Sequence, residues 1–390
     1  NVAAGPTSSY SLALYGADVI KVDHAHHSGV LLTVEIITEG KRSLVADLNT
    51  VPGQELLHKL VSWADVVIHN CVDDTAKRLG VTHRQLKAIN PNVIGCQLSA
   101  LGGTHRGGWE QRLGFDPVAQ SVSGLMAHYG TVDKPHWHGI AASSDTMGGF
   151  CLAFTSLLGV YQYRKTGYAG EGRTSLIRSV SLYQLPWMIS EHGRSDWGEA
   201  KGQFALGNHW WQRLYQCSDG WIYVAARKDQ KINFAEVVSG HRNAEEQLLE
   251  ASIAAQNCGY WLAQLDAVKI ACHEVLSSTD IRHRANVRQV DNEAADETAD
   301  KTFEVLGRED HPCGHPIMSL APNWIRVGEN QSWKRLPAAP SYGRNTREIL
   351  KELGYTQDEI AELIRLKVVY NYLPALGNKD VYFFELEKKH

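Results

Sequence analysis

Asp145 is the residue of this sequence whose type and position best suit covalent chemistry. It stands where an apolar segment gives way to a helix predicted over residues 146–163. An aspartate at this point would be the N-cap of the helix. The hydrogen bonds that it accepts from backbone N–H groups would favour its ionised form and lower its pKa. Four small residues leave room beside the carboxylate: Ser143, Ser144, Gly148 and Gly149. The local pattern is compatible with a nucleophile or with a simple helix cap.

Other catalytic and metal-binding motifs are missing from the sequence. There is no GxxxxGK[ST] phosphate loop, no GxGxxG between a strand and a helix, and no GxSxG elbow. Two groups of histidines lack a cysteine or acid at metal-ligand spacing, so we expect no metal: His24, His26 and His27, and His136 and His138. Four tryptophans are predicted as core or interface residues, or alternatively as a cage for a quaternary ammonium or sulfonium group: Trp137, Trp187, Trp210 and Trp211.

Composition describes an ordinary soluble protein of 390 residues with a net charge of −4. Its basic residues are scattered, which gives no reason to expect nucleic acid or a membrane surface as partner. No membrane span or signal peptide is visible. Seven cysteines lie far apart without a CxxC pair, which predicts reduced thiols in the cytoplasm. The sequence begins without Met, so we expect a fragment or one half of a longer polypeptide.

Strand-like runs alternate with helix-like segments in the first hundred residues. Three runs are typical of buried strands and three segments have apolar residues at helical spacing: 18–22, 65–69 and 93–98 for the strands, and 52–63, 75–79 and 82–89 for the helices. This alternation predicts an α/β fold whose parallel sheet has helices on both faces and binds ligands at the carboxyl ends of its strands. The predicted binding edge comprises residues 23–27, 70–73 and 99–103.

The second half of the chain is predicted to contain a strand and several helices. The pattern weakens around 197–207, which suggests a segment that crosses between domains. A strand is expected at 221–225, and helical patterning covers 232–255, 260–268 and 273–277. Near the end, a helix over 346–353 stops at a glycine, and Thr356 opens a capping box for another helix.

Several stretches that run in order across nearly the whole chain resemble one family, the class III CoA-transferases. This family also contains formyl-CoA transferase, carnitine CoA-transferase and α-methylacyl-CoA racemase. The resemblance is distributed over the following segments: Ala4–Pro6, Gly16–Val22, Lys41–Ser43, Ala64–Asn70, Arg78–Gly80, Asn90–Ile94, Gly114–Asp116, Val118–Gln120, the Asp145 segment, Lys165–Gly167, Gly170–Gly172, Asp219–Trp221 and Thr346–Tyr355.

The resemblance implies a Rossmann-like large domain and a smaller α+β domain in an interlocked dimer. The large CoA-binding domain would cover residues 1–190 without the family's first strand, the small domain 200–305, and residues 306–390 would return to the large domain. The partner is implied to be a second copy, or the upstream half of a tandem pseudo-dimer. The family's glycine-rich lid is not recognisable in residues 202–212.

The resemblance also implies a mechanism and a set of CoA contacts. The family's aspartate matching Asp145 attacks an acyl-CoA thioester, giving an anhydride and then an aspartyl-CoA thioester from which CoA passes to an acceptor acid. Coenzyme A, as acyl-CoA, and a small carboxylic acid are thus the implied substrates, with no metal. The implied cofactor contacts are Val2, Ala3, Ala4, His24, Asn49, Asn70, Cys71, Arg78, Leu79 and Phe115. Arg78 suits adenosine or phosphate best, although it could instead be a surface helix residue.

Two alternative functions are weighed against transfer. The racemase branch of the family has a histidine where this chain has Phe115, and phenylalanine cannot carry a proton. A CoA-binding half without catalysis would not need Asp145. Asp116 is predicted either as a helper carboxylate or as a cap or salt-bridge partner. Residues 144–154 with 184–188 resemble the C-terminal half of the tandem dimethylsulfoniopropionate CoA-transferase/lyases, which implies a sulfonium acceptor and release of dimethyl sulfide.

Overall fold

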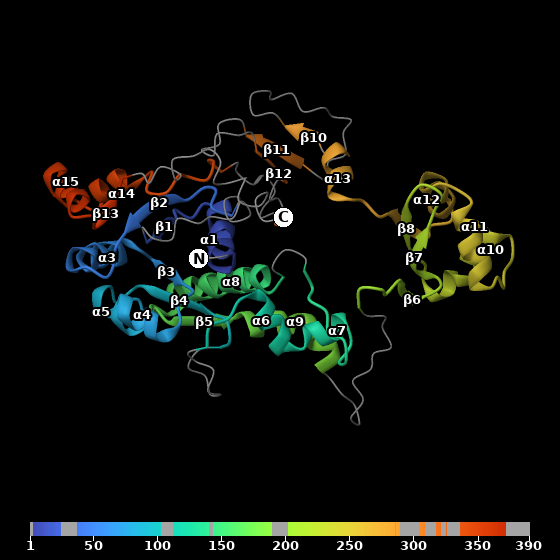
Figure 1. Ribbon diagram of the computed structural model, residues 1–390, viewed down its shortest axis with the longest axis horizontal. Helices are drawn as coiled ribbons and strands as arrows, with labels where there is room; N and C mark the ends of the chain where they lie inside the picture. The colour runs from blue at the N-terminus through green and yellow to red at the C-terminus, as the bar shows by residue number, and fades with distance from the viewer. Residues whose placement is uncertain are drawn as a thin grey trace.

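The computed structural model describes residues 3–24, 37–102, 112–139, 143–188, 202–284, 286–288, 304–308, 317–320, 325 and 336–371. It has the mixed α/β architecture expected from the sequence (Figure 1). None of the helices in this described part combines the length and the apolar character that crossing a membrane requires.

Parallel strands form the centre of the large N-terminal part. Strands β3 (Val66–His69), β4 (Ile94–Ser99) and β5 (Glu171–Ser175) pair in parallel in that order, and β1 (Ile20–Asp23) pairs in parallel with β2 (Arg42–Ala46). Helices α3 (Val51–Trp63), α4 (Asp73–Leu79) and α5 (His83–Ile89) follow the strands as the alternation predicts. The parallel strands and their helices are therefore confirmed, and the carboxyl ends of β1, β2 and β3 all lead into polar residues.

Helices α1 (Ala4–Leu14) and α8 (Ser143–Thr166) lie against each other, and two glycines of α8 set how closely it packs. A Cβ on Gly149 would lie 2.6 Å from the Thr7 Cβ and 2.8 Å from the Ala4 carbonyl oxygen. A Cβ on Gly148 would lie 2.8 Å from the Leu176 side chain, at the start of α9 (Leu176–Met188). The two glycines therefore let α1 and α9 pack closely against this turn of α8, while room beside the Asp145 carboxylate stays a prediction.

The C-terminal elements pack against the beginning of the chain. Strand β13 (Val369–Tyr370) pairs antiparallel with β2, and α14 (Thr346–Glu352) and α15 (Gln357–Arg365) share one hydrophobic cluster with β2 and α3. Thr356 forms the predicted capping box at the start of α15. Residues from both ends of the sequence thus build the same layer (Figure 1).

A second group of elements has a hydrophobic core of its own. Strands β6 (Gly207–His209), β7 (Gln212–Gln216), β8 (Trp221–Ala225) and β9 (Ala271–Glu274) form an antiparallel sheet. Helices α10 (Lys231–Ser239), α11 (Glu246–Ala254) and α12 (Cys258–Ala267) contribute to this core (Figure 1). The helix predicted over 273–277 is wrong, because those residues include the end of β9 and helix α13 begins only at Ser278 (Ser278–Arg284). Short strands β10 (Asn286–Arg288), β11 (Glu304–Arg308) and β12 (Ile317–Leu320) form another sheet.

Lys41, directly before β2, is a buried cation held against α1. Its ammonium group donates a 2.8 Å hydrogen bond to the Pro6 carbonyl oxygen, and the residue is only 5% exposed. Burial, together with the charge of Lys21, lowers the pKa of Lys41 to about 7, although Asp23 acts in the opposite direction.

We expect stability to rise between pH 7 and 9 because of Lys41. Its ordinary pKa is 10.5, so the unfolded chain holds a proton there that the folded protein has lost. The gain is on the order of 2 kcal/mol. Lys41→Met should remove this part of the pH dependence, whereas Lys351→Met, at an exposed position of α14, should retain it. Thermal midpoints at pH 7, 8 and 9 measure the effect, and parallel curves for wild type and Lys41→Met would contradict it.

Candidate active site around Asp145

Asp145 lies in the first turn of α8, whose first residue is Ser143. The residue is 8% exposed, and no group in the described part of the chain donates a hydrogen bond to its carboxylate oxygens. Burial, together with the negative charge of Asp116, raises the pKa of Asp145 to about 6. The prediction that Asp145 is the N-cap with a lowered pKa is therefore wrong in both respects.

Asp116 takes the capping role instead, from the start of helix α6 (Asp116–Ser123). Its Oδ2 accepts hydrogen bonds from the Ser144 backbone N–H at 2.7 Å, the Ser144 hydroxyl at 2.6 Å and the Asp145 backbone N–H at 3.2 Å. A negative charge is favourable at a helix N-terminus. These two N–H groups are thus occupied by Asp116 rather than by Asp145.

Of the roles predicted for Asp116, the capping role is confirmed, but the sequence did not show that the helix it caps is α8. Asp145 stands at a predicted helix start, and local patterns cannot show that a different carboxylate reaches the α8 N–H groups. The result is two carboxylates at one helix end, of which only Asp116 is fully hydrogen-bonded. Asp145 accepts no hydrogen bond at its carboxylate from the residues that the structure describes.

Three of the predicted CoA contacts come together at the carboxyl ends of β1 and β2. Asp47, which directly follows β2, links them: its Oδ1 accepts bonds from the Asn49 backbone and side-chain nitrogens at 2.9 Å, and His24 Nε2 lies 3.4 Å away. These hydrogen bonds from Asn49 lower the pKa of Asp47, and His24 adds to the effect. Arg78 on α4 donates to the Asn49 side-chain oxygen. Asp47 itself was not predicted, although its position after a strand is the signal that would have found it.

The predicted contacts after β3 lie near the start of α1. A Cβ on Gly5 would lie 3.7 Å from the Asn70 side chain. The Cys71 backbone N–H donates to His69 Nδ1 at 3.3 Å, and its carbonyl accepts from Gln97. Burial raises the pKa of the Cys71 thiol, so it is protonated and unreactive at neutral pH.

The remaining predicted contacts have different surroundings. Ala3 precedes α1 with a positive φ of 32°, and Ala4 is buried. Leu79 packs against the hydrophobic cluster that contains Leu57 and Val61, as a core residue would. Phe115 is 68% exposed at the N-cap position of α6. Val2 lies outside the described residues.

The four tryptophans belong to two parts of the chain. Trp210 and Trp211 contact each other edge to face at 5.0 Å and pack against the core of the β6–β9 sheet. Trp187 on α9 lies 5.3 Å from the His128 ring on α7 (Leu125–Tyr129), and Trp137 is exposed. The described contacts therefore do not join all four into one cage.

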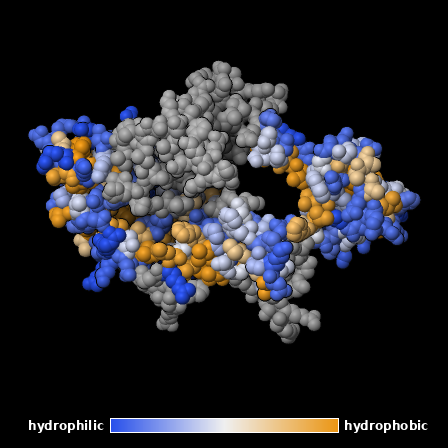
Figure 2. Space-filling model, in the orientation of Figure 1, coloured by the Kyte–Doolittle hydropathy of each residue, from blue (hydrophilic) through white to orange (hydrophobic). Residues whose placement is uncertain are grey.

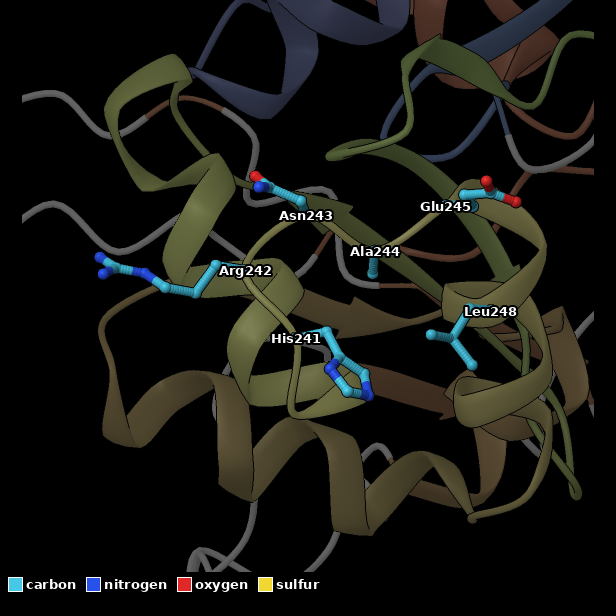
Figure 3. A pocket seen from close by; sticks show the side chains of 6 residues that line it. All are labelled: His241, Arg242, Asn243, Ala244, Glu245 and Leu248. Carbon is cyan, nitrogen blue, oxygen red and sulfur yellow. The ribbon is translucent and has the colours of Figure 1, made fainter.

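Two surface cavities among the described residues lie away from Asp145. One, of about 420 Å³, lies at the connection between α10 and α11 and is lined by His241, Arg242, Asn243, Ala244, Glu245 and Leu248 (Figure 3). The other, of about 500 Å³, lies between α3 and α14. In Figure 1, α10 and α11 lie at one end of the molecule and α3 and α14 at the other, with α8 between the two pairs.

Metal binding finds no support in this part of the chain. No group of three or more histidine, cysteine, aspartate or glutamate side chains in the described segments is arranged to hold a metal ion. His24 is close to Asp47, and the His138 ring contacts Tyr129 edge to face at 4.8 Å. His26 and His27 lie outside the described residues.

Comparison with known proteins gives consistent results. The sequence profile of CoA-transferase family III matches residues 1–346. CoA-transferase/lyase DddD of Marinomonas sp. (strain MWYL1) is 30% identical over 377 residues, which cover 94% of this chain and 44% of that protein. Succinyl-CoA–D-citramalate CoA-transferase of Chloroflexus aurantiacus is 24% identical over 407 residues, with 94% of each chain covered.

A solved structure supports the fold. The crystal structure of a CAIB/BAIF family protein from Brucella suis matches with a TM-score of 0.67 at 22% identity, covering 90% of this chain and 96% of that one. The chain spans less than half the length of the Marinomonas protein but nearly the whole length of the Chloroflexus enzyme. Because the profile covers most of the sequence, the chain belongs to CoA-transferase family III.

Proposed function

We propose that this chain transfers CoA from an acyl-CoA donor to a small carboxylic acid, with Asp145 as the nucleophile. A carboxylate oxygen of Asp145 attacks the thioester carbonyl carbon, the C–S bond breaks, and a mixed anhydride and CoA thiolate form. The thiolate attacks the Asp145 carbonyl carbon, which releases the donor acid and leaves an aspartyl-CoA thioester. The acceptor carboxylate then displaces the thiolate, which attacks the new anhydride at the acceptor carbonyl, releases the product acyl-CoA and restores Asp145.

The state of the Asp145 carboxylate is the observation that carries this proposal. It is buried, and no group in the described segments donates a hydrogen bond to it, so no hydrogen bond from these segments has to break before it attacks. With a pKa of about 6 it is still mostly ionised at pH 7.5. Residues that merely cap helices have their oxygens occupied, as Asp116 does here.

The cluster of His24, Asn49 and Arg78 supports a CoA site at the carboxyl ends of the strands. The planar guanidinium of Arg78 suits phosphate groups or an adenine ring. Its hydrogen bond to Asn49 and the link from Asn49 to Asp47 would hold it in place. We extend the site to Ala3, Ala4, Asn70 and Cys71, near the start of α1.

Racemisation and a non-catalytic role are the competing proposals. A racemase needs two positioned proton carriers, and Phe115 cannot be one. A CoA-binding half without chemistry would not require a buried carboxylate that costs stability when ionised. Both features favour transfer.

Dimethylsulfoniopropionate is the acceptor that we propose to test first, with subsequent release of dimethyl sulfide as a lyase. The resemblance of residues 144–154 and 184–188 to tandem CoA-transferase/lyases supports it, as does the 30% identity to DddD. Aromatic rings attract a sulfonium cation, and Trp187 and Trp137 belong to the same part of the chain as α8.

A second copy of the chain, or a tandem half, is the proposed partner. Helix α8 carries an exposed apolar stripe at helical spacing, formed by Phe154, Leu157, Leu158 and Tyr161. Helix α9 adds the exposed leucines Leu182 and Leu185. Figure 2 shows hydrophobic side chains gathered over this part of the surface. Such patches are typical of protein interfaces.

We further propose domains at 1–190 and 200–305, with a segment at 306–390 that returns to the first domain. We also propose a cytoplasmic location, which the free cysteines of the described part support.

Intact-protein mass spectrometry after incubation with acetyl-CoA tests the proposal. Trapping with hydroxylamine or borohydride should leave a modification that maps to Asp145 in the wild type and is missing from Asp145→Ala. Acceptor acids can then be screened, with dimethylsulfoniopropionate first. If CoA binds and no modification forms, the covalent proposal is wrong and the competing functions take its place.

A further inference from the structure

Gln120 is a fully buried amide that connects three segments around the two aspartates. It lies one helical turn after Asp116 on α6 and is 0% exposed. Its Nε2 is 2.5 Å from Asp116 Oδ1, 3.1 Å from the His138 carbonyl oxygen and 3.3 Å from the Ser143 hydroxyl. Its Oε1 accepts a 3.2 Å hydrogen bond from the His138 backbone N–H.

These partners require an amide at this position, in one orientation only. Asp116 Oδ1 and the His138 carbonyl can only accept, so the nitrogen must face them, while the His138 N–H needs the oxygen. A carboxylate of the same shape would keep one bond, lose the donations and place a second negative charge beside Asp116. An apolar side chain of similar length would remove the partners of the buried Asp116 Oδ1 and of both backbone groups of the partly buried His138.

We propose that Gln120 is a positioning residue for Asp145, holding the Asp116 carboxylate on the first turn of α8 and fixing the segment at His138 against it. The proposal rests on Asp145 being the nucleophile. Gln120 binds one oxygen of the Asp116 carboxylate and α8 binds the other, so the Asp116 carboxylate cannot rotate toward Asp145. Gln120 thereby fixes the distance between the two negative charges.

Within the segments that the structure describes, few charged groups act on Asp145. Asp116 on α6 raises its pKa, and the amino terminus of the chain lowers it. The side chains that meet the neighbouring turn of α8 from α1, β4 and α9 are uncharged: Thr7, Leu98, Leu176 and Ser179. A change in the Asp116–Gln120 pair should therefore act directly on the ionisation of Asp145.

Single-turnover acylation of Asp145 by acetyl-CoA, followed by mass spectrometry between pH 4.5 and 8.5, tests this role. We expect the midpoint of the wild-type pH profile near 6. Gln120→Glu, which is almost isosteric, should move the midpoint upward by about one unit because of the added charge. Gln120→Met should lower the maximal acylation rate by about 10–100-fold, as misplacement of a reacting group does, while the affinity for CoA changes less than twofold.

Gln184→Met is the matched control. Gln184 on α9 is also 0% exposed and donates to the Ser123 carbonyl oxygen, so the same substitution leaves buried groups unpaired without touching either aspartate. It should lower the thermal midpoint and leave the pH midpoint of acylation in place. A wild-type profile in both Gln120 variants, or an equal shift in Gln184→Met, would overturn the role of Gln120. Failure of the wild type itself to acylate Asp145 would overturn the proposed function instead.

Discussion

Asp145→Asn is expected to lower kcat for CoA transfer by about 10⁴-fold or more, because a nucleophile that forms the covalent intermediates cannot be replaced by a neighbouring group. The amide has nearly the same shape and cannot form the anhydride. Asp116 does not substitute for it, since both its oxygens are engaged by α8 and Gln120. Steady-state transfer from acetyl-CoA to an acceptor acid measures kcat. A separate binding measurement gives the affinity for CoA.

The matched control for this loss is Asp219→Asn. Asp219 accepts a hydrogen bond from the backbone N–H of Cys258 at the start of α12, so the substitution makes the same chemical change at another helix start. We expect transfer within twofold of wild type. Residual transfer of more than about 1% in Asp145→Asn with normal stability would mean that another group carries the reaction.

Asp145→Asn is also expected to stabilise the folded protein at neutral pH. The folded pKa of Asp145 is raised from 3.8 to about 6, so between these values the folded state binds more protons than the unfolded state. Stability therefore falls as the pH rises through this range and stays lower above it. Asn carries no charge, and Asp145→Asn should recover about 3 kcal/mol at pH 7.5 and roughly half of that at pH 5.

Thermal midpoints of wild type and Asp145→Asn at pH 5 and pH 7.5, at one protein concentration, measure this gain. The variant should unfold a few degrees higher at pH 7.5, and the gap should narrow at pH 5. A variant that is less stable than wild type at pH 7.5 would show that the carboxylate stabilises the fold, as a cap does. That result would contradict the interpretation of Asp145 as a carboxylate whose ionisation lowers the stability of the folded protein.

The parts of the fold that were predictable are those set by local patterns. The apolar runs of β3 and β4 and the helical spacing of α3 and α5 need only neighbouring residues to be recognised. Strand β9 was missed because four residues are too few to separate a strand from a helical turn. The strand pattern predicted the edge that contains His24, whereas Asn49 and Arg78 were predicted only through the resemblance, since they reach His24 and Asp47 through chain segments far apart in sequence.

The candidate site illustrates the same division between local and distant causes. Asp145 was identified from its place at a helix start, but its ionisation depends on Asp116, which is brought in by a different helix. The roles of Gly148 and Gly149 also depend on distant segments, α1 and α9, that fill the space beside them. Sequence patterns were enough to select Asp145 as the proposed nucleophile, while its electrostatic surroundings required the structure.

The return of the C-terminal segment to β2 has a consequence for synthesis on the ribosome. The Ser43 backbone N–H donates to the side chain of Asn345, 302 residues later, and β13 pairs with β2 beyond that point. At typical translation rates the edge of β2 waits roughly 15–60 s for these partners. During that time an unpaired strand is exposed and prone to association. We expect the nascent chain to depend on chaperones during this interval, until β13 has been synthesised and can pair with β2.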